Sequence, residues 1–179
     1  MGNERAAPRR IWFYNRFYWP DESATAQILT DLAGHLAEHH WQVRVVSSRL
    51  RYEKATGQPA LPWTQIHQGV HIERLWSTSF GRRHLPGRLV DYLSFYASLF
   101  LHLLRKPQPG DLVVLKTDPP LLSIPGWLAA QLRPLRLVAW CQDLFPEVAV
   151  HALPDFPGRA TLFGCLKALR THSLNGCEQ

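Results

Sequence analysis

Short apolar runs alternate with longer segments of helical periodicity along most of the chain. Buried strands are predicted at 10–15, 42–47, 70–76, 111–115 and 135–141. Amphipathic or apolar helices are predicted at 24–39, 89–104 and 120–132, with a last helix from Pro157 to about His172. The Gly- and Pro-containing stretch 52–69 is expected to be a loop. This alternation predicts an α/β fold, a Rossmann-like doubly wound sheet whose strands are mostly parallel.

Composition narrows the class of protein. The chain has 179 residues, 46% hydrophobic and 19% charged, with a net charge of +6, so a single domain with a real core is expected and disorder is excluded. The positive charge favours phosphates or anionic lipid, and no nucleic-acid-binding signature accompanies it. Three cysteines without CxxC spacing and an N-terminus without an apolar leader favour a cytoplasmic location.

Three loops are candidates for the ligand-binding surface. In an open parallel sheet, ligands bind at the carboxyl ends of the strands, where strand order reverses. That point is expected between strands 10–15 and 111–115. The loops that meet there are 20–25, 117–120 and, after the neighbouring strand, 142–147.

The loop at 20–25 leads into helix 24–39, whose apolar face is expected to comprise Ile28, Leu29, Leu32 and Leu36. Unpaired N–H groups around Ser23, Ala24 and Thr25 could bind an anionic or hydroxyl-bearing ligand. The alternative is that Asp21 and Ser23 simply cap the helix. The sequence leaves both interpretations open.

Carboxylates follow the later strands. Asp118 precedes two prolines, and a rigid turn is favoured there over a site formed by Thr117 and Asp118. Asp143 and Glu147 lie four apart after strand 135–141, where a carboxylate could orient a hydroxyl or act as a general base. The alternative is that both are solvated loop charges.

Several kinds of site are not predicted. No G-x-G-x-x-G follows the first strand and no P-loop motif occurs, so nicotinamide-dependent enzymes and P-loop ATPases are disfavoured. His35 and His39 lie one helical turn apart without a third ligand, which favours a solvent-facing pair over a metal site. No metal and no cofactor are expected.

The apolar segment 89–104 is shorter than the ~20 residues of a membrane span, and it contains Asp91 and His102. A packed helix is therefore the default expectation. The alternative is a helix lying on an anionic bilayer, because basic residues flank the segment. These are Arg82, Arg83, Arg88, Arg105 and Lys106.

Four ordered segments, YWPDESATAQILTDLA, FGRRHLPGRLVDYLSF, TDPPLL and QDLFPE, resemble the N-terminal domain of GT-B glycosyltransferases of family four. The resemblance is to the colanic-acid-type and capsular or O-antigen polysaccharide enzymes. It implies two facing Rossmann-like domains, the first holding the acceptor and the second the nucleotide-sugar. It also implies transfer with retention of anomeric configuration and without a metal in the active site.

The resemblance assigns roles to residues of this chain. Pro20, Asp21, Ser23, Ala24 and Thr25 would approach the donor phosphate and the acceptor, with Ser23 where the family has glycine. Asp143, in QDLFPE, would orient the acceptor or give base-like assistance and is the catalytic candidate. The remaining substrate-binding candidates at the same edge are Thr117, Asp118, Gln142 and Glu147.

Residues 1–179 are accordingly predicted to form the acceptor-side domain only, incomplete at its C-terminus, with the donor-binding domain absent. Such a chain is expected to be inactive alone. The expected partners are a nucleotide-sugar bound mainly by the other domain, a sugar or lipid-linked sugar acceptor, and an anionic membrane surface at the inner face of the cell membrane. The alternative is a non-catalytic Rossmann-like module that binds a partner or a membrane surface.

Overall fold

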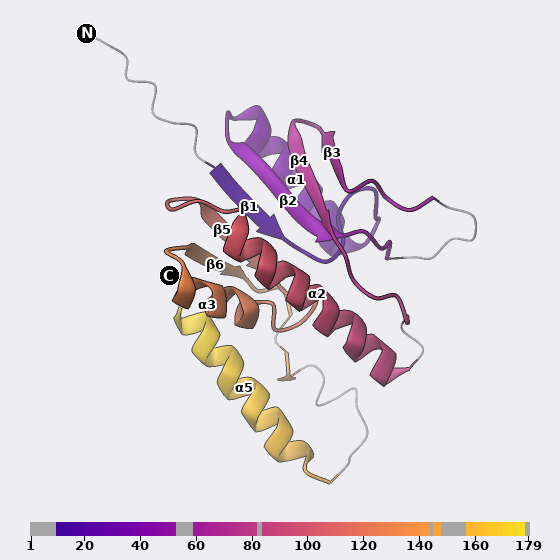
Figure 1. Ribbon diagram of the computed structural model, residues 1–179, viewed down its shortest axis with the longest axis vertical. Helices are drawn as coiled ribbons and strands as arrows, with labels where there is room; N and C mark the ends of the chain where they lie inside the picture. Colours follow the sequence, from indigo (N-terminus) through magenta and orange to yellow (C-terminus); the bar gives the residue numbers. More distant parts are fainter. Residues whose placement is uncertain (1–9, 53–58, 82–83, 144, 148–156, 178–179) are drawn as a thin grey trace.

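The computed structural model describes residues 10–52, 59–81, 84–143, 145–147 and 157–177. These form a six-stranded sheet in the order β3-β4-β2-β1-β5-β6, flanked by helices (Figure 1). The strands are β1 Arg10–Tyr14, β2 Gln42–Ser48, β3 Thr64–His67, β4 Val70–Leu75, β5 Leu112–Lys116 and β6 Arg136–Trp140, and the described helices are α1 Ala24–Glu38, α2 Leu85–Arg105, α3 Ser123–Leu132 and α5 Arg159–Asn175.

Strand β1 lies at the centre of the sheet and pairs in parallel on both sides. Phe13 is aligned with Val45 of β2 and with Val114 of β5. From β1 the chain builds outward through β2 and β4 and then returns to add β5 and β6 on the opposite side. The order therefore reverses between β1 and β5, as predicted from the sequence.

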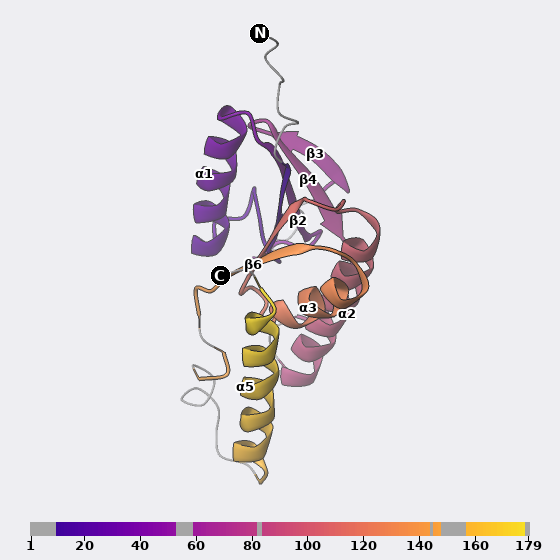
Figure 2. The same cartoon turned by 90° about the vertical axis from the view of Figure 1, so that its left-hand side faces the viewer.

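Helices cover both faces of the sheet, which explains why the strands are apolar on both sides. Phe13 faces α1, where it packs in a cluster with Leu29 and Ala33. Trp12 faces the other way, into a cluster that includes Phe95 and Leu99 of α2. Figure 2 shows α1 on one side of the sheet and α2 and α3 on the other, which confirms the doubly wound architecture.

Strand β3 corrects the prediction that 52–69 is a loop. It pairs antiparallel with β4, and Gln68 and Gly69 join the two strands with φ values of 49° and 74°. Two positive φ angles are typical of a type I′ hairpin turn, which matches the right-handed twist of the strands. The strand escaped prediction because it is a short edge strand whose apolar residue, Ile66, is 64% exposed.

Helix boundaries and faces differ in detail from those predicted. Ile28 was assigned to the buried face of α1 but is 48% exposed, and Ala26 is buried in its place. Helix α2 begins four residues earlier than predicted, with Pro86 in its first turn, where the missing N–H costs nothing. Helix α3 begins after Leu122, since Leu121 has a positive φ of 65°.

A chain of polar groups is buried between the sheet and α2. The hydroxyl of Tyr14 lies 3.0 Å from Nδ1 of His102, and Nε2 of the same ring lies 3.2 Å from Oε2 of Glu73. Arg44 donates to the other carboxylate oxygen of Glu73 at 2.9 Å. Helix α2 is therefore fixed to the sheet by hydrogen bonds as well as by apolar packing.

Within the described ranges, no helix has both the length and the apolarity that crossing a membrane requires.

Candidate functional site

The three predicted loops meet at the carboxyl ends of β1, β5 and β6. The backbone N–H of Arg16, in the segment that leads from β1 to the first loop, donates to the carbonyl of Asp118 at 2.7 Å. Oγ1 of Thr117 accepts from the backbone N–H of Gln142 at 3.2 Å and so joins the second loop to the third. The N–H of Asp143 lies 3.4 Å from the same Oγ1. We call the surface formed by 20–25, 117–120, 142–143 and 145–147 the loop rim.

The first loop of the rim is held from β4. Arg74 is buried and donates to the carbonyl of Trp19, which precedes a cis peptide bond to Pro20. Asp21 accepts from the backbone N–H of Tyr52 at 2.9 Å. The loop is therefore braced on both sides before the helix begins.

The capping interpretation of this loop is wrong. Ser23 occupies the N-cap position of α1, with φ −63° and ψ 145°, but no side chain makes a capping hydrogen bond there. Its hydroxyl instead lies 3.4 Å from that of Thr25. The first turn of α1, including Ala24, consequently offers backbone N–H groups and the positive end of the helix dipole to the rim.

Lys116, the last residue of β5, was not identified from the sequence. It is 1% exposed, its Nζ donates to the carbonyl of Thr25 at 2.8 Å, and the same atom lies 4.3 Å from the centre of the Trp140 ring. Burial lowers its pKa to about 8, although the Asp118 carboxylate opposes the shift. The available signal was a lysine that ends an otherwise apolar strand.

The middle loop of the rim, 117–120, is held from α2. The peptide bond between Asp118 and Pro119 is cis, and the hydroxyl of Tyr96 donates to the carbonyl of Pro120. Burial raises the pKa of Tyr96 well above its usual range, so the hydroxyl stays a donor. Helix α2 thus anchors the middle loop of the rim.

Arg170 of α5 anchors the loop that carries Asp143. It donates to the carbonyl of Phe145 at 3.0 Å and to both carboxylate oxygens of Glu147 at 2.5 and 3.1 Å. These hydrogen bonds hold the pKa of Glu147 below its usual range. Glu147 therefore serves to attach the loop to α5, a role that the sequence did not indicate.

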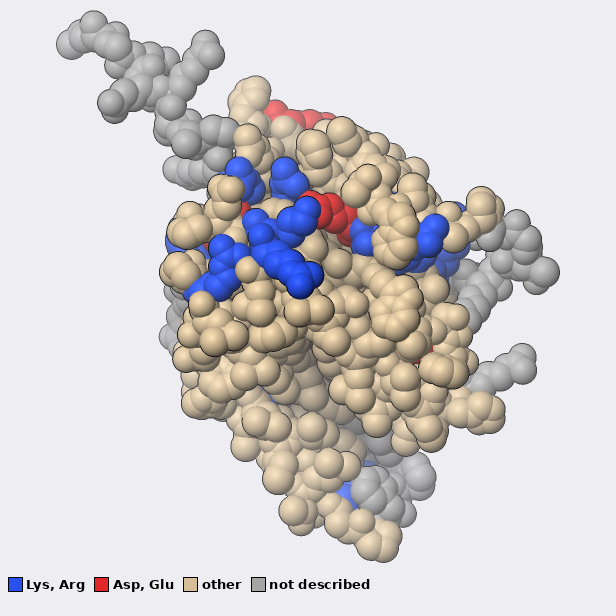
Figure 3. Space-filling view, in the orientation of Figure 1, with Lys and Arg blue, Asp and Glu red and all other residues tan. Residues whose placement is uncertain are grey.

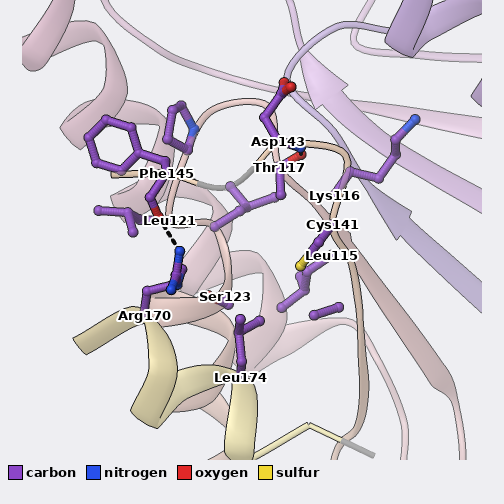
Figure 4. Close-up of a pocket in the computed structure, with 13 residues that line it drawn as sticks. Leu115, Lys116, Thr117, Leu121, Ser123, Cys141, Asp143, Phe145, Arg170 and Leu174 are labelled. Atoms are coloured by element: carbon purple, nitrogen blue, oxygen red, sulfur yellow. Dashed lines mark hydrogen bonds between the residues drawn. The ribbon is translucent and has the colours of Figure 1, made fainter. Parts of the chain in front are cut away.

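A small cavity lies beneath this loop, and Asp143 is at its outer side. Figure 4 shows Arg170 and Leu174 below the cavity, with the exposed carboxylate of Asp143 pointing away from it. The cavity measures about 20 Å³, room for a single water molecule. A sugar would consequently have to lie on the outer surface of the rim, on the side to which Asp143 points.

A larger cavity of about 210 Å³ lies on the other side of β1. Its walls come from the segments that follow β1, β2 and β4 and from the first turns of α2. They include Arg16, Phe17, Arg51, Tyr52, Arg88 and Asp91. The sequence analysis did not identify this cavity, although Arg16 directly follows a buried strand.

No group of three or more metal-ligating side chains occurs in the part of the chain that the structure describes. His35 and His39 are both exposed, and Nδ1 of His39 lies 2.8 Å from the carbonyl of His35. The pair therefore faces solvent, as predicted.

Comparison with known proteins shows the fold. No family model and no curated protein matches the sequence. Among solved structures, a sucrose-phosphate synthase from Thermosynechococcus elongatus is similar over 90% of this chain, with a TM-score of 0.59 and 14% sequence identity. The chain spans 40% of the length of that protein. The chain thus has the fold of a Rossmann-like half of a GT-B glycosyltransferase, as predicted.

Proposed function

We propose that residues 1–179 form the acceptor-binding domain of a retaining glycosyltransferase that moves a sugar from a nucleotide-sugar to a polysaccharide intermediate. The observation that carries the proposal is the loop rim itself. Its three loops converge where strand order reverses, in the fold of a GT-B half. The finer assignment, to family four and its colanic-acid-type, capsular or O-antigen enzymes, rests on the four sequence segments described above.

Asp143 is the group that we propose for orienting the acceptor hydroxyl. Its carboxylate is exposed, while its backbone N–H is directed to Thr117 and its loop is fixed by Arg170. A backbone held by hydrogen bonds, with an exposed carboxylate, suits a hydrogen bond to a sugar hydroxyl. The uncapped start of α1, at Ser23 to Thr25, suits an approaching donor phosphate.

The donor would bind mainly to a facing domain, so binding and transfer can be tested separately. Saturation-transfer NMR of the 179-residue chain with a panel of simple glycosides should detect binding, and Asp143→Asn should weaken it. Asp31→Asn, on the exposed side of α1, is the matched control. Nucleotide-sugar turnover by the isolated chain, or glycoside binding indifferent to Asp143→Asn, would contradict the proposal.

We further propose that the acceptor is lipid-linked and that the domain lies on an anionic membrane surface at the cytoplasmic side. Helix α2 exposes Leu85, Leu89 and Leu93 at 65%, 55% and 55%, one turn apart on one side. Figure 3, which views the side of the molecule that α2 covers, shows Lys and Arg gathered over the C-terminal end of this helix and a broad uncharged surface below. Apolar insertion and basic attraction would then act on the same face.

Vesicle flotation tests the membrane proposal. The chain should float with vesicles that contain phosphatidylserine, and Leu89→Ser with Leu93→Ser should abolish flotation. Leu132→Ser, at the end of α3 and 67% exposed, is the control for loss of an exposed leucine. Equal recovery with neutral and anionic vesicles, or flotation of the double variant, would refute it.

A further inference from the structure

The larger cavity carries an unusual concentration of positive charge. Three arginines and one aspartate line it, so at neutral pH its walls have a net charge of +2. They come from parts of the chain far apart in sequence: Arg16 follows β1, Arg51 follows β2 and Arg88 lies in the first turns of α2. Convergence of like charges costs energy unless something offsets it, so the arrangement requires an explanation.

One carboxylate lines the cavity, that of Asp91 in α2, and it lies within ion-pair distance of Arg16. Asp91 is 3% exposed and accepts hydrogen bonds from the hydroxyl of Thr78 and from the backbone N–H groups of Phe80 and Gly81. Its nearest arginine atom, Nη2 of Arg16, is 3.9 Å away. Asp91 therefore mainly fixes the segment between β4 and α2.

The three arginines differ in the hydrogen bonds that their guanidinium groups make. Nε of Arg51 is buried and has no hydrogen-bond partner among the described residues. Arg88 is exposed and donates from Nε to the hydroxyl of Tyr92. This hydrogen bond does not use the two terminal nitrogens of its guanidinium group. Guanidinium groups with unused N–H donors bind phosphate oxygens in pairs, at fixed geometry.

The shape of the cavity agrees with a phosphate ligand. Its volume of about 210 Å³ is about ten times that of the single-water cavity beneath the rim, enough for a phosphate or diphosphate group. Phe17 and Tyr52 form an aromatic wall, with ring centres 5.3 Å apart. Tyr52 also donates its backbone N–H to Asp21 of the loop rim, so the cavity and the rim share a wall.

We propose that this cavity binds a phosphate or diphosphate monoester, and that this group belongs to the acceptor. The identity of the ligand as the acceptor rests on the function proposed above, whereas binding of the anion does not. Arg51 and Arg88 would bind the phosphate oxygens. The sugar attached to this phosphate would reach the loop rim across the end of β1.

Isothermal titration calorimetry with inorganic pyrophosphate tests the proposal. The wild-type chain should bind it, and Arg51→Gln and Arg88→Gln should each raise the Kd about tenfold or more, since each removes charge-assisted hydrogen bonds. Arg105→Gln, exposed at the other end of α2, should leave the Kd unchanged. Circular dichroism and the Tm of each variant establish that it is folded.

A second arm identifies the source of the anion. If the acceptor is lipid-linked, phosphatidylcholine vesicles with a small fraction of polyprenyl diphosphate should bind the wild-type chain and lose it to excess pyrophosphate. Binding of pyrophosphate without such recruitment supports a soluble sugar phosphate. No pyrophosphate binding, or an unchanged Kd in both cavity variants, overturns the proposal. Glycoside binding that still depends on Asp143 would then leave the proposed function intact.

Discussion

Replacing Glu73 by glutamine should remove a large part of the stability of the domain at neutral pH. The carboxylate lies between the sheet and α2, its side chain 16% exposed, with His102 at 3.2 Å and Arg44 at 2.9 Å. The hydrogen bond from His102 is the largest contribution to its shifted pKa, which falls from 4.5 to about 2 against the opposing effect of burial. Glutamine has a similar shape but cannot carry the charge.

The magnitude follows from linkage between protonation and folding. A depressed carboxyl pKa means that the unfolded chain binds a proton at a higher pH than the folded chain does. The contribution is therefore complete above pH 4.5 and is lost as the pH falls through about 2. At about 1.4 kcal/mol for each pH unit, the shift corresponds to about 3 kcal/mol. That is a substantial share of the ~5–15 kcal/mol of a typical domain.

Urea unfolding followed by tryptophan fluorescence measures this difference. Near neutral pH, Glu73→Gln should lower the free energy of unfolding by about 3 kcal/mol, and the gap should narrow towards pH ~2 as the wild-type carboxyl is protonated. Glu38→Gln, at the exposed end of α1, should show neither effect. A gap that is absent near neutral pH, or that stays constant with pH, would refute the reasoning.

Three further changes test other parts of the fold. Gly126→Ala should lower the free energy of unfolding by about 1–3 kcal/mol, because its Cβ would overlap Cδ1 of the buried Leu115; thermal unfolding at wild-type Tm would contradict this. Asp111→Ala should cost about 2–3 kcal/mol in urea unfolding, since Trp12 Nε1 and the N–H of Gln108 would lose their acceptor. Arg170→Lys should speed hydrogen exchange around Asp143 while global stability changes little, because the side chain of its partner Glu147 is 39% exposed; an unchanged exchange rate would count against it.

The sheet was predictable because its strands are buried on both faces. Strand β1 reads as a short apolar run whose alternate residues, Trp12 and Phe13, face opposite layers, and a run of this length is typical of a buried strand. Strand β3 lies at the edge of the sheet, where it pairs with β4, and its Ile66 is exposed. An apolar run on both faces is therefore missing, and the same reasoning could not find this strand. Hydrophobic periodicity reflects burial, and an edge strand is buried only slightly.

The position of the site was predictable, but the side chains that hold its loops in place were not. The loops at the carboxyl ends of β1, β5 and β6 follow from topology, which fixes where strand ends meet. The groups that hold those loops come from distant segments: Arg74 from β4, Lys116 buried at the end of β5, and Arg170 from α5. Such partners depend on three-dimensional proximity, which a single sequence does not encode locally.

The two candidate sites are parts of one surface. Arg16 and Tyr52 both line the larger cavity. The backbone N–H of Arg16 donates to the carbonyl of Asp118 in the loop rim, and that of Tyr52 donates to Asp21 of the rim. The carboxyl end of β1 therefore lies between a positively charged cavity and the exposed carboxylate of Asp143. An acceptor with a phosphate at one end and a hydroxyl at the other would be oriented by opposite charges across that strand end, because reversing it would place its phosphate against Asp143. The positively charged cavity and the Asp143 carboxylate would together fix the direction in which the acceptor binds, and not its affinity alone.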